Sequence, residues 1–166
     1  MNTKRVFILF LLGLVISIPA CFGMSGIKRE YYSSGKLKLE GNYKEGKQDG
    51  LTKVYYESGA LKAEMNYKKG KQDGLTKIYS ENGRPNLERN YKNGKLEGLS
   101  KIYYESGRLN IEWNYQNGKL EGLTKEYYES DAIKNIDTYK IGQKINRKAY
   151  DEKGKLKFDQ DYSYME

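Results

Sequence analysis

The side chains that most enzymes use for chemistry are scarce in this sequence. The chain contains no histidine, and Cys21 is its single cysteine. Catalytic triads use an imidazole base or a thiol nucleophile, and zinc sites take histidine or cysteine ligands. The sequence therefore predicts no catalytic residues, no metal site and no bound cofactor.

Carboxylates are abundant, but they do not form an isolated catalytic pair. Asp49 and Glu57 recur with the regular spacing of the chain, which favours a role in turns or between strands. The segment GKQDG, residues 46–50, has the composition of a phosphate-binding loop but lacks its strand-loop-helix context. We therefore expect a protein that is not an enzyme.

Aromatic residues are the other group that could act on a partner. The chain holds 17 tyrosines and a single tryptophan, Trp113. Tyrosine and tryptophan bury a large area with few rotors and are enriched at interfaces. Candidate binding residues are Trp113, Tyr56, Tyr104 and Tyr128, and the alternative is that the tyrosines only cover the backbone. Trp113 stands where other copies of the repeat carry Gly41, Met65 and Arg89.

The first segment, residues 1–23, has the layout of an export signal. Lys4 and Arg5 precede the mostly apolar residues 6–18, a run shorter than the ~20 residues that span a bilayer. The sequence predicts that this segment is a helix in the precursor. IPAC, ending at Cys21, resembles a bacterial lipobox, which implies lipidation of Cys21 and a lipoprotein anchored in the envelope or at the cell surface. Cleavage after Gly23 would instead release a soluble secreted protein.

A 24-residue repeat fills the remainder, residues 24–166. Copies start near residues 26, 50, 74, 98 and 122, and a shorter one starts near residue 145 because a residue is missing after Gly142. The same interval separates the glycines Gly26, Gly50, Gly74, Gly98 and Gly122 and the tyrosines Tyr43, Tyr67, Tyr91, Tyr115 and Tyr139. Breaks in the repeat, at Trp113, at Pro85 and after Ser130, are the places where specificity is expected.

Each copy contains two turn signals, which predict two strands per repeat. Asn93-Gly94 favours a two-residue type I′ turn, and Glu57-Ser58-Gly59 marks the other turn. The repeats contain no uninterrupted helical window, and their apolar period is two. It therefore predicts an all-β protein: an elongated, single-layer antiparallel meander of β-hairpins with about eleven or twelve strands.

Charge pairing supports the predicted register. With Ser58-Gly59 as a two-residue turn, Tyr56 faces Leu61 and Lys53 faces Glu64. The same rule pairs Arg29 with Glu40, Lys77 with Glu88, Lys101 with Glu112 and Lys148 with Asp159, whereas Lys125 meets Ile136. Across the second turn the rule places Lys62 opposite Lys77, an unfavourable pair.

The net charge is +8, but acidic residues are interleaved with the basic ones. A nucleic-acid-binding protein needs a segregated basic face, so no nucleic-acid partner is expected. The lysines Lys53, Lys77, Lys101 and Lys125 form a stripe that could contact anionic lipid. We expect a monomer that reaches the membrane through its N-terminal lipid.

The pattern GxxxxYYxxGxLxxExxYxxGKxxG, as in residues 50–74, resembles the bacterial variant of the MORN repeat. The resemblance implies elongated sheets of β-hairpins that bind and scaffold other molecules, with membrane association in eukaryotic members. Some bacterial relatives are grouped with antitoxins or immunity proteins, and the family offers no catalytic residues. The function expected is a non-enzymatic envelope or surface scaffold that binds a protein of unknown identity, such as a host or envelope protein, or binds a glycan. The alternatives are neutralisation of a toxin and binding to anionic lipid.

Overall fold

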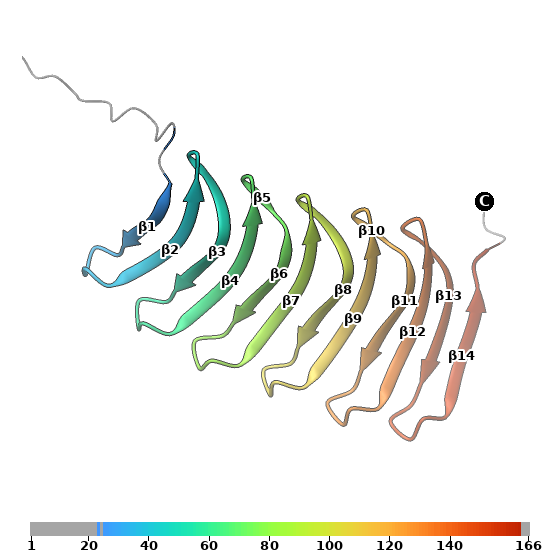
Figure 1. The fold of residues 1–166 in the computed structure, drawn as a ribbon. Helices are drawn as coiled ribbons and strands as arrows, with labels where there is room; N and C mark the ends of the chain where they lie inside the picture. The colour runs from blue at the N-terminus through green and yellow to red at the C-terminus, as the bar shows by residue number, and fades with distance from the viewer. Residues whose placement is uncertain (1–22, 24, 164–166) are drawn as a thin grey trace, which may run out of the picture.

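The computed structural model of the protein describes residues 23 and 25–163, and all of its regular elements are strands. They form one open antiparallel sheet in a single layer, with the strands in chain order from one edge to the other (Figure 1). The all-β, single-layer meander predicted from the sequence is thereby confirmed. Residues 23 and 25–163 contain no helix that could span a membrane. The predicted signal helix lies outside the described residues.

Twelve strands run side by side, and two short segments, β5 and β10, continue as β6 and β11 after a one-residue break. The strands are β1 (Gly26–Tyr31), β2 (Leu37–Lys44), β3 (Lys47–Tyr55), β4 (Leu61–Lys68), β5 (Lys71–Gln72), β6 (Gly74–Tyr79), β7 (Pro85–Lys92), β8 (Lys95–Tyr103), β9 (Leu109–Gln116), β10 (Lys119–Leu120), β11 (Gly122–Tyr127), β12 (Ile133–Lys140), β13 (Gln143–Tyr150) and β14 (Leu156–Asp161).

The turn between β2 and β3 is a two-residue turn, as predicted. Lys44 pairs with Lys47, and the residues between them, Glu45 and Gly46, have φ angles of 51° and 74°. Positive φ at both central positions is the mark of a type I′ turn, whose twist matches that of the flanking strands. Asn93 and Asn117 hold the same conformation in later copies.

The other turn is one residue longer than predicted. The N–H of Tyr56 donates to the carbonyl of Ala60 at 2.8 Å, and the N–H of Gly59 donates to the carbonyl of Tyr56 at 2.9 Å. Gly59 has a φ of 94°. This is a three-residue loop, a type I turn followed by a left-handed glycine. The predicted pairing of Tyr56 with Leu61 is therefore wrong, and Tyr55 faces Leu61 instead.

The register of the strand bodies is nevertheless the predicted one. Val54 pairs with Ala63 and Lys53 with Glu64, so Lys62 is an extra residue that bulges out of β4. The longer loop shifts the pairing by one residue, and the bulge at Lys62 shifts it back. The predicted pairing of Lys125 with Ile136 is also confirmed.

The predicted contact between Lys62 and Lys77 is wrong, because a wider β-bulge beside the two-residue turn changes the register. In the first copy, Asn42 alone stands opposite residues 49–51, and its Nδ2 donates to the carbonyl of Leu51 at 2.7 Å. In the next copy the same bulge moves the register by two residues. Glu64, not Lys62, therefore faces Lys77.

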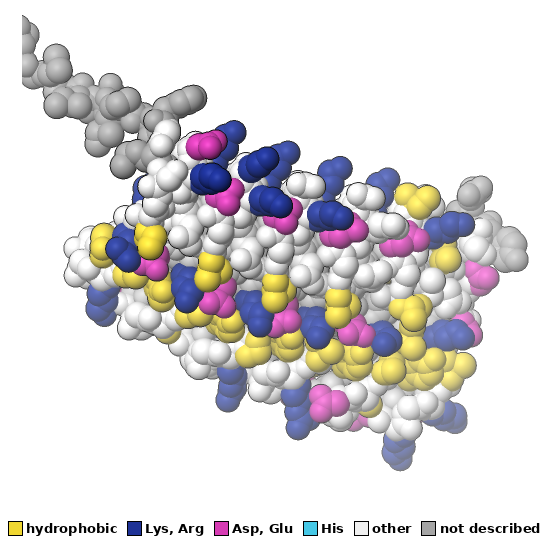
Figure 2. Space-filling view, viewed as in Figure 1, with side chains coloured by type: hydrophobic (Ala, Val, Ile, Leu, Met, Phe, Trp, Pro, Cys, Tyr) yellow, Lys and Arg dark blue, Asp and Glu magenta, His cyan; other side chains and the backbone are white. Residues whose placement is uncertain are grey.

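These two corrections produce a row of charges across one face, here called the charge ladder, with one uncharged position, Ile136 on β12. Each interior glutamate of the ladder has a basic residue on both neighbouring strands, and the row continues to both edges of the sheet. It consists of Arg29, Glu40, Lys53, Glu64, Lys77, Glu88, Lys101, Glu112, Lys125, Ile136, Lys148 and Asp159. Figure 2 shows alternating basic and acidic side chains crossing the middle of this face.

Tyrosines cover the glutamates of the ladder. The hydroxyl of Tyr127 donates a hydrogen bond to Glu112 at 2.9 Å, and the hydroxyl of Tyr79 donates one to Glu64 at 3.4 Å. Burial and the hydrogen bond to Glu112 raise the pKa of Tyr127 to about 12. These tyrosines are therefore structural hydrogen-bond donors at neutral pH.

The opposite face, here called the hydroxyl face, has small buried side chains along its centre. Thr52, Thr76, Ser100 and Thr124 are 0–7% exposed. The strands are curved along their length (Figure 1). Apolar residues flank this row in β2 to β9, among them Leu39, Val54, Ala63, Ile78, Leu87, Ile102 and Ile111.

Hydrogen bonds between successive turns join the repeats. The carboxylate of Asp49 accepts from the backbone N–H of Lys69, 20 residues later, at 3.0 Å. The N–H of Gly70 also donates to the carbonyl of Gln48 at 2.8 Å. Asp73, Glu97 and Glu121 repeat the carboxylate contact in later copies. The repeated acids thus bind the turns of the following copy, which fits the role in turns or between strands that the sequence favours.

Candidate binding site

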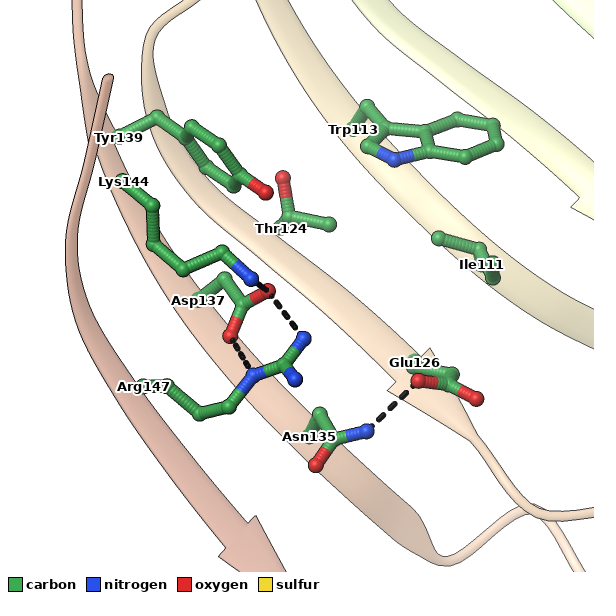
Figure 3. A pocket seen from close by; sticks show the side chains of 9 residues that line it. All are labelled: Ile111, Trp113, Thr124, Glu126, Asn135, Asp137, Tyr139, Lys144 and Arg147. Carbon is green, nitrogen blue, oxygen red and sulfur yellow. Dashed lines mark hydrogen bonds and ion pairs between the residues drawn. The ribbon is translucent and has the colours of Figure 1, made fainter. Parts of the chain in front are cut away.

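The hydroxyl face changes character over β9, β11, β12 and β13. These strands carry Glu126, Asn135, Asp137 and Arg147 on this face; the three preceding copies have apolar side chains at the positions of Glu126 and Asn135, and threonine or serine at the position of Arg147. Together with Trp113 they line an open hollow of about 180 Å³, here called the polar hollow (Figure 3). Its remaining lining residues are Ile111, Thr124, Tyr139 and Lys144.

Asp137 is the centre of the polar hollow. It is 5% exposed and accepts two hydrogen bonds from Arg147, from Nε to Oδ1 and from a terminal nitrogen to Oδ2, both at 2.7 Å. Lys144 Nζ lies 2.7 Å from Oδ2. A buried carboxylate requires such partners, and the planar guanidinium supplies two of its bonds in one geometry.

The pKa values of this group follow from those contacts. Burial acts to raise the pKa of Asp137, but the hydrogen bonds from Arg147 and Lys144 outweigh it and leave the pKa below its ordinary value of 3.8. The hydrogen bond to Asp137 raises the pKa of Arg147. Asp137 is therefore ionised at neutral pH and cannot serve as a proton donor there.

Glu126 forms a second paired carboxylate beside the first. Lys134 Nζ and Asn135 Nδ2 each lie 2.6 Å from one of its oxygens. Burial acts to raise the pKa of Glu126, whereas the bonds from Lys134 and Asn135 lower it, and the net shift is downward. The two carboxylates thus face three cationic side chains, which leaves a formal charge of +1 on the cluster.

An aromatic and apolar wall stands opposite the charges. Trp113 and Ile111 project from β9, and Thr124 on β11 separates Trp113 from Asp137 (Figure 3). Tyr139 on β12 lies at the turn end of the hollow beside Lys144. The hollow therefore combines a flat aromatic surface with fixed hydrogen-bonding groups, which suits recognition.

The polar hollow offers no catalytic group. Both of its carboxylates are ion-paired with lowered pKa values, and its hydroxyl groups have no adjacent base of the kind that activates a nucleophile. Among the described residues no group of histidine, cysteine and carboxylate side chains could hold a metal ion.

Trp113 is the one candidate binding residue from the sequence that lies in the polar hollow. Tyr56, Tyr104 and Tyr128 have hydroxyls that donate to the backbone carbonyls of Tyr79, Tyr127 and Tyr150 in the following hairpin, at 2.7–2.9 Å. Lys62 and Lys134 also lie over the rings of Tyr56 and Tyr128. These hydrogen bonds join hairpins. Cys21 lies outside the described residues.

Sequence reasoning did not single out Asp137, Arg147, Lys144 or Glu126. The feature of the sequence that pointed to this region was the irregular copy after Ser130, which contains Asp137, Lys144 and Arg147. The missing residue after Gly142 narrows the bulge in β12–β13 to one residue, because Tyr139 faces Lys144 and Thr138 faces Asn146. Arg147 thereby reaches the position that Thr124 holds one copy earlier. Pro85, another break in the repeat, is the first residue of β7 and pairs with Tyr79.

No curated protein matches the chain. A crystal structure of the GtfA/B complex bound to UDP and GlcNAc matches with a TM-score of 0.29 and 9% identity, covering 67% of this chain and 22% of that chain. The present chain thus spans less than a quarter of that protein, and so slight a likeness carries no functional argument.

The family model for the MORN repeat variant matches five successive segments. They are residues 24–45, 48–69, 72–93, 96–117 and 120–140, which together cover well over half of the chain. Each segment holds one strand pair joined by the three-residue loop and ends near a two-residue turn. MORN repeats are commonly associated with binding to proteins or membranes. The chain belongs to the MORN repeat variant family.

Proposed function

We propose that the protein is a non-enzymatic binding scaffold that recognises a partner protein at the polar hollow. The observation that carries the proposal is the departure of β11 to β13 from the repeat on the hydroxyl face. Glu126 stands where the three preceding copies carry valine or isoleucine, and Arg147 stands where they carry threonine or serine; Asp137 and Trp113 lie next to them. Tryptophan, tyrosine and arginine are the side chains most enriched in the energetic centres of protein interfaces.

The cell envelope or surface is the proposed location, and this part rests on residues 1–23 alone. The positive residues, the short apolar run and the IPAC sequence support export followed by lipidation of Cys21. The alternative is a soluble secreted product cleaved after Gly23. Mass spectrometry of the mature N-terminus distinguishes them, because a lipidated product begins at Cys21 and carries acyl chains.

Crosslinking in intact cells, followed by affinity capture, tests the binding proposal. The expected result is that the wild-type chain captures a specific protein and that Trp113→Ala reduces its recovery at least about tenfold. Met65→Ala is the matched control, because Met65 holds the same position of the repeat two copies earlier. Equal recovery by the two variants would show that the polar hollow is not the binding surface.

The other functions raised by the sequence give different outcomes in the same experiment. A toxin that acts outside the cytoplasm would be captured if the protein is an immunity factor. Contact with anionic lipid through Lys53, Lys77, Lys101 and Lys125 would give salt-sensitive vesicle binding instead. Neighbouring acidic residues on the charge ladder weaken that idea, since Lys53, Lys77 and Lys101 each lie between two glutamates.

A further inference from the structure

The two edges of the sheet, β1 and β14, are open strands. Every residue of β1 is exposed, and β14 is exposed except at Gln160. Tyr31 and Phe158 are 58% and 40% exposed, although their counterparts in the interior repeats are half-buried or buried. An open strand presents unpaired N–H and C=O groups to any chain that can extend the sheet.

The repeat makes the two edges complementary in direction and face. Strand direction alternates along twelve adjacent strands, so β1 and β14 run in opposite directions. β1 corresponds to β3 and β14 to β2 in the repeat, and β2 pairs with β3 inside the sheet. A second copy shifted along the sheet axis therefore places its β1 antiparallel to β14, with matching faces.

The charges at the two edges are complementary as well. The charge ladder ends in the base Arg29 on β1 and in the acid Asp159 on β14. β1 carries two bases and one acid, a formal +1, whereas β14 carries one base and two acids, a formal −1. Pairing β1 with β1, or β14 with β14, brings like ladder charges together, which disfavours a symmetric dimer.

We propose that copies of this chain associate head to tail, with β14 of one copy pairing with β1 of the next and Asp159 opposite Arg29. In this contact Arg29 and Asp159, the two ends of the charge ladder, each gain an oppositely charged neighbour on a second strand. The contact also covers Tyr31 and Phe158. Because each copy keeps one free edge of either kind, the assembly is open-ended. β1 starts and β14 ends at the end of the sheet where the two-residue turns lie (Figure 1).

A charge-swap experiment on the full-length chain in detergent tests the contact. Sedimentation velocity over a concentration series should show salt-sensitive association of the wild type. Arg29→Asp alone and Asp159→Arg alone each place like charges at the junction and should weaken association about tenfold or more. Mixing the two single variants, or combining both changes in one chain, restores opposite charges and should restore association.

Mixing the two single variants also distinguishes loss of the contact from loss of folding. A variant that had merely unfolded would not associate with its complement. Far-UV circular dichroism of each variant checks the fold directly. A wild type that stays monomeric throughout the series overturns the proposal. Association of both single variants at wild-type strength does the same.

The register itself is tested by disulfide formation. In the proposed pairing Lys28 faces Gln160 of the next copy, so Lys28→Cys/Gln160→Cys in a Cys21→Ser background should give a ladder of linked multimers on oxidation. The matched control Lys28→Cys can link at most two chains. Multimers that stop at dimers in the double variant would contradict an open-ended contact.

Discussion

Asp137 occupies a position at which earlier copies carry glycine, methionine, arginine or tryptophan. Because a buried carboxylate without partners is strongly destabilising, the buried Asp137 needs its ion pairs with Arg147 and Lys144. The three side chains therefore depend on one another for their positions. They hold the polar hollow in one shape before any partner arrives, which lowers the cost of ordering on binding.

Asp137→Asn is expected to lower the free energy of unfolding by about 1–3 kcal/mol at pH 7, because two cationic side chains lose their buried counter-charge. The pKa of Asp137 is lowered in the folded protein, so its contribution is complete above the ordinary value of 3.8 and is lost as the pH falls below that value. Urea denaturation of both proteins from pH 7 to pH 3 measures the difference, which should shrink only at the acidic end.

Asp159→Asn is the control for this prediction. The side chain of Asp159 is 43% exposed and has one ion-pair partner, Lys148 at 3.5 Å. Exposed ion pairs contribute roughly 0–1 kcal/mol, so this change should be small. An effect of Asp159→Asn as large as that of Asp137→Asn would mean that burial does not distinguish the two sites.

Two hydroxyl deletions on the hydroxyl face should have opposite effects. Tyr104→Phe removes a hydrogen bond to the carbonyl of Tyr127 and should destabilise by about 0.5–1.5 kcal/mol. Ser100→Ala removes a buried hydroxyl that has no partner among the described residues, so it should be neutral or stabilising. Thermal unfolding of both variants measures the contrast, and a loss of stability in Ser100→Ala would mean that the hydroxyl has a partner such as a bound water.

At the level of the hairpin, the bulges decide which charges meet. The wide bulge beside the two-residue turns that follow β2, β4, β7 and β9 has a glycine with positive φ at its centre. Gly74 has a φ of 107°, and a Cβ there would lie 3.2 Å from the Cβ of Asn66. Without this bulge, Lys77 would face Lys62, and the charge ladder would be broken at every repeat.

Gly74→Ala is therefore expected to destabilise the protein by roughly 1–3 kcal/mol, because it combines a left-handed backbone with a close side-chain contact. Gly59→Ala is the matched control: Gly59 also has a positive φ, 94°, but no atom lies within 4 Å of its added Cβ. Guanidinium denaturation should show the larger loss for Gly74→Ala. Equal losses would mean that Asn66 moves aside and only backbone strain matters.

The sequence predicted the pairing of Lys53 with Glu64 although it missed both the third loop residue and the bulge at Lys62. The two errors cancel in the strand bodies because the longer loop shifts the pairing by one residue and the bulge at Lys62 shifts it back. The pairing of Glu64 with Lys77 was not predicted, because a glycine in a strand pattern does not reveal how many residues bulge out. In the polar hollow, Trp113 was identifiable as a singular residue. Arg147 was not identifiable, because its position on the sheet depends on where the strand pairing shifts to make up for the missing residue of the last copy.

At the scale of the whole sheet, the main contacts between the described elements join strands that are neighbours in the sheet. The stability of such an array is approximately the sum of its repeats and of the interfaces between them. The described residues form no second layer that would limit the number of copies. The regular interior copies are therefore interchangeable, whereas those that form the polar hollow are not.

Deletion of residues 74–97, one complete repeat, should leave a folded sheet with a lower unfolding midpoint, because Glu64 then faces Lys101 and the ladder stays in phase. Circular dichroism and thermal unfolding measure the result. Deletion of residues 74–85 is the contrast. It removes half a repeat, so all later strands run the wrong way and the chain should lose its cooperative transition. Folding of the half-repeat deletion would contradict the dependence on phase.

The stacking of strands also sets a distance. Neighbouring strands lie ~4.8 Å apart, so each 24-residue copy adds about 10 Å to the sheet, and β11 lies roughly 40 Å from β1. If the chain is held at its N-terminal end, the interior copies act as a spacer that presents the polar hollow at a set reach from the anchor. Adding or removing one copy would then change that reach in steps of one repeat without altering the hollow itself.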